Sequence, residues 1–181
     1  MKIRDATPAD ATAIKLMIRE LIAYEGTNIE LTFTVEQLAA ALSGEAPRLR
    51  GLIAEDADGI AGFATYTVDF AIWTGGDVLR IDDVFVRERA RGAGAGSALM
   101  ARIAEIGVAH GMPCRWEIEV SNTRAQHFYS TLGVEIRSNY IVGRMKTIDE
   151  LFAEGFSAIF LGLGAGIPSF RSFVYCYCAN A

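Results

Sequence analysis

The sequence predicts an α+β domain, and three observations support this class. The chain has 181 residues, enough for one domain with a sizeable core and barely enough for two. Hydrophobic residues make up 51% of it, which favours a folded globular protein. Up to residue 145 the predicted elements follow the order β-α-α-β-β-β-α-β-α-β-β. This order lacks the strict strand and helix alternation of a doubly wound fold.

Residues 2–5 are predicted to form an opening strand. TPAD, at residues 7–10, supplies a threonine N-cap, a proline for the first helical position and an acid in the first turn. Thr34 and Gln37 have the spacing of a capping box and open a second helix. The apolar face of the first helix is predicted from helical spacing to contain Ile14, Met17, Ile18, Leu21 and Ile22.

The middle of the chain alternates between strands and turns. Strands are predicted at residues 51–54, 60–68 and 78–86, followed by a glycine-rich stretch and a helix that ends at Gly111. A strand at residues 116–120, a short helix at 123–131 and one or two closing strands at 134–145 complete the predicted order.

The stretch RARGAGAGS, residues 89–97, lies between a predicted strand and a predicted helix. In this arrangement the helical N–H groups and the helix dipole can face a phosphate. Gly92, Gly94 and Gly96 lack a Cβ and would let it approach the backbone, with Arg91 at the mouth as a complementary cation. The alternative is that glycine relieves a close contact between helix and strand. A Walker loop and a dinucleotide fingerprint are excluded, because no lysine follows Gly96 and the spacing is Gly-x-Gly-x-Gly.

The spacing Arg-x-x-Gly-x-Gly of Arg91, Gly94 and Gly96 resembles a signature of the GNAT superfamily of acyl-CoA-dependent N-acetyltransferases. NTRAQHFYSTLG, residues 122–133, is similar to the second signature of that family. The resemblance covers roughly residues 1–145. It implies an α/β/α sandwich around a mixed, mostly antiparallel sheet that splays between the fourth and fifth strands.

Within the superfamily the chain looks most like the diamine and thialysine acetyltransferases. The shared segments are Ala23-Tyr24-Glu25, GFATY at residues 62–66, Trp73 and IDDVFV at residues 81–86. The resemblance therefore implies acetyl transfer from acetyl-CoA to a primary amine of a small cationic substrate, by direct attack in a ternary complex. Two alternatives stay open: a non-catalytic acyl-CoA-binding or regulatory module of the same fold, and N-acetylation of a protein or peptide amine.

The resemblance also implies which residues bind acetyl-CoA. The amides from Arg91 to Ser97 would hold the pyrophosphate, the backbone of residues 84–86 would line the pantetheine arm, and Asn122 would contact the cofactor or cap a helix. The full predicted set is Val84, Phe85, Val86, Arg91, Gly92, Ala93, Gly94, Ala95, Gly96, Ser97 and Asn122.

For catalysis, the resemblance assigns the general base to Asp82 and the general acid to Tyr129, while Asp83 holds the cationic substrate. The subgroup commonly has glutamate where Asp82 stands, so its shorter reach favours a bridging water. Adjacent strand residues face opposite ways, so Asp82 and Asp83 share one surface only if the strand is distorted. Both can equally be solvent-exposed or form structural ion pairs, and Tyr129 can be a packed aromatic like Phe128.

Tyr24, Glu25 and Trp73 match positions that contact the amine, although helix-end packing is an equal alternative for Tyr24. No metal site is expected, because His110 and His127 lack a partner at metal-ligand spacing.

The net charge of −5 argues against nucleic-acid binding. No membrane partner is expected either, because the longest apolar stretch, residues 156–170, is short and rich in glycine. Charges in the first ten residues and an odd number of cysteines indicate a cytoplasmic protein. The resemblance implies a homodimer.

Residues 146–181 are predicted to be a C-terminal extension to a GNAT domain of residues 1–145. The extension resembles the opening of a flavin- or nicotinamide-binding domain of a glutamate-synthase-like oxidoreductase. It is too short to work as one, because a βαβ unit needs about 30 residues or more. Three interpretations of the extension remain: a fused fragment, a packing or dimerisation arm, or a disordered end. The apolar content of the extension favours a buried arm.

Overall fold

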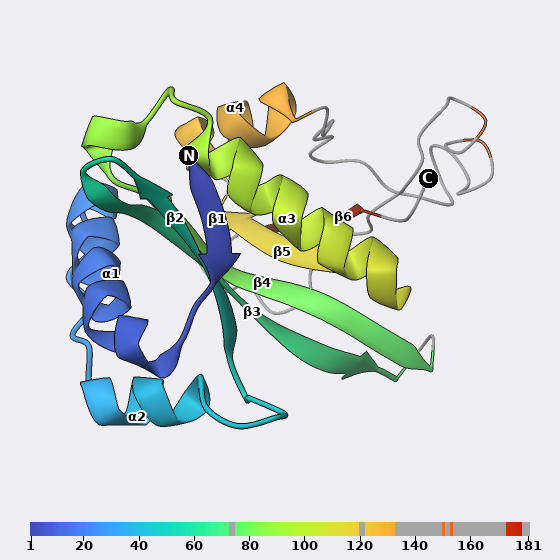
Figure 1. Cartoon of the computed structure of the whole chain (residues 1–181). Coiled ribbons are helices and arrows are strands. Elements are labelled where there is room, and N and C mark those ends of the chain that lie inside the picture. Colours follow the sequence, from blue (N-terminus) through green and yellow to red (C-terminus); the bar gives the residue numbers. More distant parts are fainter. Residues whose placement is uncertain (73–74, 120–121, 133–149, 151–152, 154–172, 179–181) are drawn as a thin grey trace. The chain divides into compact units, whose positions relative to one another are not determined.

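The computed structural model of the chain is drawn in Figure 1, and it describes residues 1–72, 75–119, 122–132, 150, 153 and 173–178. The strands are β1 (Lys2–Asp5), β2 (Arg50–Asp56), β3 (Gly59–Ala71), β4 (Gly76–Val86), β5 (Cys114–Glu119) and β6 (Phe173–Cys178). The helices are α1 (Ala11–Glu25), α2 (Val35–Ala41), α3 (Ala95–His110) and α4 (Thr123–Thr131), with the 3₁₀ turns η1 (Pro8–Asp10) and η2 (Glu88–Ala90).

The described strands are hydrogen-bonded in the order β1-β2-β3-β4-β5-β6. The chain divides into two compact units, residues 1–68 with 81–105 and residues 69–80 with 106–181. β3, β4 and α3 each contribute to both units. The first unit therefore contains the glycine stretch, and the second contains β5, β6 and α4.

In the first unit, the sheet is antiparallel across β1, β2 and β3 and is covered on both faces. Leu52, Ile53 and Ala54 follow one another along β2 and are all fully buried, although neighbours in a strand face opposite sides. Ile53 packs with Phe63 and with the buried face of α1 and α2. The helices α1 and α2 lie together beside these strands (Figure 1). The buried members of this cluster are Ala11, Ile14, Met17, Leu38, Leu42, Ile53, Phe63 and Phe85.

The helix starts follow the sequence prediction. Pro8 occupies the first position of η1 and α1 continues from it, ending at Gly26 in the left-handed region, with φ of 66°. In α2 the Thr34 hydroxyl accepts a hydrogen bond from the Gln37 amide, while the Gln37 side chain accepts one from the Thr34 amide. The predicted capping box is confirmed.

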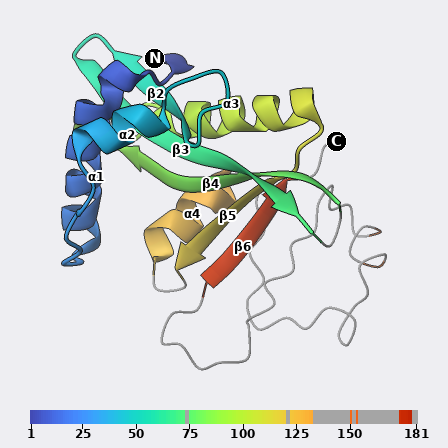
Figure 2. The ribbon, with the colours of Figure 1, turned by 90° about the horizontal axis from the view of Figure 1, so that it is seen from below.

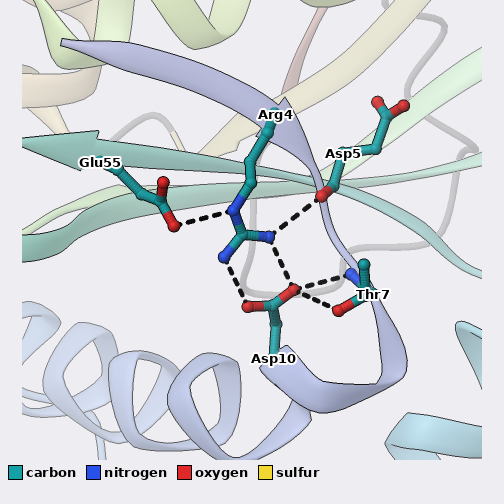
Figure 3. A network of polar contacts seen from close by, with 5 residues as sticks. All are labelled: Arg4, Asp5, Thr7, Asp10 and Glu55. Carbon is teal, nitrogen blue, oxygen red and sulfur yellow. Dashed lines mark hydrogen bonds and ion pairs between the residues drawn. The ribbon is translucent and has the colours of Figure 1, made fainter.

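A polar network joins β1 to the start of α1 (Figure 3). Both terminal nitrogens of Arg4 donate to the Asp10 carboxylate at 2.8 Å, and Arg4 Nε donates to Glu55 at 2.8 Å. The amide and the hydroxyl of Thr7 also donate to Asp10. These hydrogen bonds, above all those from Arg4, lower the pKa of Asp10 to about 2. A bidentate, largely buried pair of this kind fixes where α1 begins.

The β2–β3 register contains an irregularity beside a close contact with β4. Ala54 pairs with Gly62 and Glu55 with Ile60, so the ladder skips Ala61. A Cβ placed on Gly62 would lie 2.6 Å from the Phe85 carbonyl oxygen and 3.2 Å from Val86. Glycine is therefore required here for the approach of two strands.

In the second unit, β5 is paired on both sides. Its ladder with β4 is parallel and joins Leu79 to Cys114 and Arg80 to Arg115. Its ladder with β6 is antiparallel and runs along the whole of both strands, which lie side by side in Figure 2. Gly107 lies within α3, and close packing requires glycine there, because a Cβ would lie 2.7 Å from the Met112 carbonyl oxygen.

The α+β class with a mixed, mostly antiparallel sheet is confirmed by these ladders. β6 was not predicted, although FVYCYC is a continuous apolar run of a length typical of a strand. The predicted closing strands at 134–145 lie outside the described residues, and of the predicted extension only residues 150, 153 and 173–178 are described. The splay between the fourth and fifth strands and the domain boundary at residue 145 stay predictions.

Replacing Asp10 by Asn should lower the free energy of unfolding by about 2 kcal/mol at pH 7, measured by urea denaturation. Folding lowers the pKa of Asp10 from 3.8 to about 2, so the stabilisation is complete above ~pH 4 and is lost as the pH falls towards 2. The difference in the free energy of unfolding between wild type and D10N should therefore decrease as the pH falls from ~4 towards 2. Asp58→Asn is the control, because its side chain is 84% exposed and should change stability by less than about 0.5 kcal/mol. A constant difference from pH 5 to pH 2 would contradict the role of the carboxylate charge.

Replacing Gly62 by Ala should lower the free energy of unfolding by about 1–3 kcal/mol, because the new methyl group meets backbone atoms of β4. Gly76→Ala is the matched control within a strand, since its Cβ would have no heavy atom within 4 Å. Equal midpoints for G62A and G76A in urea would show that β3 and β4 tolerate a wider spacing.

Candidate functional site

The glycine stretch follows the end of β4, and two arginines tie its entrance to other elements of the first unit. Arg87 donates twice from Nε and once from Nη2 to the Glu20 carboxylate of α1, at 2.9–3.2 Å. Arg89 donates to Asp56 at 2.7 Å. Both guanidinium groups also donate to the Ile60 carbonyl at 3.0 Å.

The backbone repeats this connection, because the Arg87 amide donates to the carbonyl of Ala61, the residue that the β2–β3 ladder skips. The bulge thus presents two successive carbonyl groups to the segment before the loop. Neither arginine was among the predicted site residues. The sequence feature that could have identified them is the placement of arginine at every second position, 87, 89 and 91, directly after the strand.

Arg91 was predicted at the mouth of the loop, where a phosphate would bind. Its Nε donates to the Val86 carbonyl at 3.0 Å, and its guanidinium carbon lies 4.0 Å from the centre of the Tyr24 ring and 5.8 Å from that of Phe85. The side chain is therefore stacked on α1. Residues 84–86 were predicted to line the pantetheine arm, and the carbonyl group of Val86 already accepts a hydrogen bond from Arg91.

The two exposed glycines of the loop are required by backbone conformation. Gly92 and Gly94 have φ values of 77° and 81°, which side chains other than glycine rarely adopt. A Cβ on either would have no heavy atom within 4 Å. Relief of a close packing contact therefore does not explain these two residues, and the space above them is open to a ligand.

The start of α3 offers amide donors that have no partner within the helix. The Gly94 carbonyl accepts from the Ala98 amide, so Gly94 closes the first helical turn. By helix geometry, the amides of Ala95, Gly96 and Ser97 precede the first intrahelical donor and point out of the helix end. Those donors, the dipole and the open glycine turn fit the diphosphate of coenzyme A. Ala93 and Ser97 are exposed beside them, whereas Ala95 is buried.

A cluster of carboxylates lies in the same unit. Burial of the Asp83 carboxyl, and then repulsion by Asp82 and Glu25, raise the pKa of Asp83 to about 6. Asp82 is exposed and Asp83 is half-buried, in line with their adjacent positions on β4. Glu25 is the exposed last residue of α1. The structure thus brings together three of the residues predicted for base catalysis and amine binding.

In the second unit, Tyr129 is buried on α4 with 8% of its surface exposed. Its ring lies 5.3 Å from that of Trp116 and 5.0 Å, edge-on, from that of Phe128, measured between centroids. Asn122 caps α4, because its Oδ1 accepts from the Ala125 amide at 3.0 Å. The predicted capping role is confirmed, and the cofactor contact stays a prediction.

Trp73 lies outside the described residues. His110 and His127 are exposed, as predicted. Within the described ranges, no group of three or more His, Cys, Asp or Glu side chains is arranged to hold a metal ion. None of the described helices has the length and apolar character needed to cross a lipid bilayer.

The chain is similar to known proteins. Residues 17–134 match the model of the Acetyltransferase (GNAT) family. Thialysine N-epsilon-acetyltransferase of Sus scrofa is 32% identical over 140 residues, covering 72% of this chain and 82% of that protein. The Bos taurus enzyme of the same name is 30% identical over 142 residues, covering 74% and 83%. A structure of a possible acetyltransferase from Clostridium difficile 630 superimposes with a TM-score of 0.65 at 23% identity, covering 77% of this chain and 94% of that one.

The structural likeness supports the fold, and the family model together with the curated relatives supports the activity. The chain belongs to the GNAT family and is an acetyltransferase.

Proposed function

We propose that the chain transfers an acetyl group from acetyl-CoA to a primary amine of a small cationic substrate, by direct attack in a ternary complex. Thialysine or a polyamine represents the substrate class. The observation that carries the proposal is the carboxylate cluster of Asp82, Asp83 and Glu25, in the same unit as the open glycine turn. The relatives named for thialysine acetylation support the choice of a cationic amine.

The cluster has the two properties that such a substrate requires. Its negative charges attract an ammonium group, whose reference pKa is ~10.4. It must also accept a proton, because only the neutral amine attacks a thioester carbonyl. A carboxyl with a pKa of about 6 is ionised at neutral pH and is a stronger base than an ordinary aspartate. This favours Asp83 as the proton acceptor, whereas the resemblance assigns that role to Asp82, directly or through a water.

For the leaving group, we assign the general acid to Tyr129, whose phenol would give its proton to the departing thiolate sulfur. The two have comparable basicity, with a reference pKa near ~10 for the phenol. Packing against Trp116 and Phe128 restricts the ring, which suits a group that must present its hydroxyl in one direction. Acetyl-CoA supplies the activated acyl group when it is bound.

The assignment of the acceptor leaves one rival, a protein or peptide amine. A panel of thialysine, polyamines, lysine and short peptides, each assayed with acetyl-CoA by release of free thiol, separates the two classes. The panel is run on the full chain and on a chain ending at residue 145, which also tests whether residues 146–181 form a separable extension. A homodimer is proposed on the resemblance, and sedimentation of the full chain tests it. A cytoplasmic location is proposed on the odd number of cysteines.

Replacing Tyr129 by Phe should lower kcat by about 10²-fold or more, because the thiolate then leaves without a proton donor. The affinity for coenzyme A, measured by calorimetry, should stay within about twofold. Ser130→Ala is the control on the same helix, since its hydroxyl bonds only to the helical carbonyl of His127 among the contacts described. An unchanged kcat in Y129F would remove Tyr129 from the mechanism.

The dependence of kcat/KM on pH should show an acidic limb near 6 in the wild type, because activity needs ionised Asp83. In Asp82→Asn the limb should move to lower pH, since loss of a like charge makes the Asp83 proton easier to remove. In Asp83→Asn the limb should disappear and kcat/KM should fall by about 10²-fold. A wild-type limb in D83N, together with loss of activity in D82N, would instead place the base at Asp82.

A further inference from the structure

Two contacts join the last turns of α1 to the segment before the glycine turn. Glu20 holds Arg87, and Tyr24 holds Arg91. Glu20 and Tyr24 are four residues apart in α1, so they lie on the same face of the helix one turn apart. Arg87 and Arg91 are likewise four residues apart and flank η2. One helix face thus contacts the loop entrance at two successive points.

The contact at Tyr24 is close. The guanidinium carbon of Arg91 lies 4.0 Å from the ring centroid, the distance at which a planar cation stacks on an aromatic face. Its Nε donates at the same time to the Val86 carbonyl, so the side chain is held at two points. A cationic substrate could not use the ring face that Arg91 covers.

The turn beyond Arg91 has little packing of its own. Cβ atoms on Gly92 and Gly94 would meet no heavy atom within 4 Å, and both residues are exposed. Glycine is also the residue with the most backbone freedom to lose. Besides the buried Ala90 and Ala95 at its two ends, the direction of the turn therefore depends on the side-chain contacts of Arg87, Arg89 and Arg91.

We infer that Tyr24 is a positioning residue of the glycine turn: acting through Arg91, it sets the affinity for the diphosphate of coenzyme A and does not contact the amine. This inference rests on the proposed function, since it takes the turn to be the coenzyme site. It departs from the prediction that Tyr24 binds the substrate. The amine is then recognised by the carboxylates of Asp82, Asp83 and Glu25.

The test measures binding of coenzyme A by calorimetry, without amine and without turnover, on the wild type, Y24A, Y24F, R91A and the double variant Y24A/R91A. Y24A should weaken coenzyme A binding about three- to tenfold, while Y24F, which keeps the ring, should stay within about twofold. In the R91A background, Tyr24→Ala should add less than about twofold, because the stack is already lost. The KM for the amine should change by less than about twofold in Y24A.

Leu16→Ala is the matched control for damage to α1, because Leu16 lies two turns before Tyr24 and is 48% exposed. It should leave coenzyme A binding unchanged. Wild-type coenzyme A affinity in Y24A, or equal effects of Tyr24→Ala with and without Arg91, would overturn the inference and leave the proposed function standing. Absence of coenzyme A binding in the folded wild type would overturn the proposed function itself.

Discussion

The candidate site depends on three arginines at alternating positions after β4. Arg87, Arg89 and Arg91 are held by α1, by the end of β2 and by the bulged start of β3. Ion pairs at this degree of exposure contribute little to the free energy of unfolding. Their importance is geometric, because Gly92, Ala93 and Gly94 are exposed and have little side chain with which to fix the direction of the turn. Elements far apart in the sequence thus set the position of the amides at the start of α3.

The acidic residues of β4 and the arginines that follow it lie in different electrostatic environments. The arginines beyond its end have carboxylate or carbonyl partners, whereas Asp83 is desolvated beside two further acids. Folding raises the pKa of Asp83, so its ionisation above about pH 6 opposes folding, unlike that of Asp10, which supports it. A fold does not need this repulsion for its stability. The repulsion among these carboxylates is consistent with the proposed binding of a cationic amine, since an ammonium group would neutralise the cluster.

The C-terminal segment has a structural role in the second unit. β6 extends the sheet at β5 through six residue pairs, from Cys114 with Cys178 to Glu119 with Phe173. An edge of β5 that would otherwise present free amide and carbonyl groups is covered by this pairing. The tail was predicted to be an arm that is buried somewhere, and its strand shows one place where it is held. Its resemblance to an oxidoreductase fragment stays a prediction.

Local sequence determined where the helices begin and which residues are glycine for conformational reasons. The capping box at Thr34 and the left-handed positions in the RARGAGAGS stretch depend on neighbours a few residues away, so the pattern contains the information. The two GNAT signatures then gave the family. Only the tertiary structure decided that Arg91 stacks on Tyr24, that Asp83 has the perturbed carboxyl and that β6 pairs with β5. Each depends on segments that are distant in the chain, and burial, like-charge repulsion and strand pairing exist only once those segments meet.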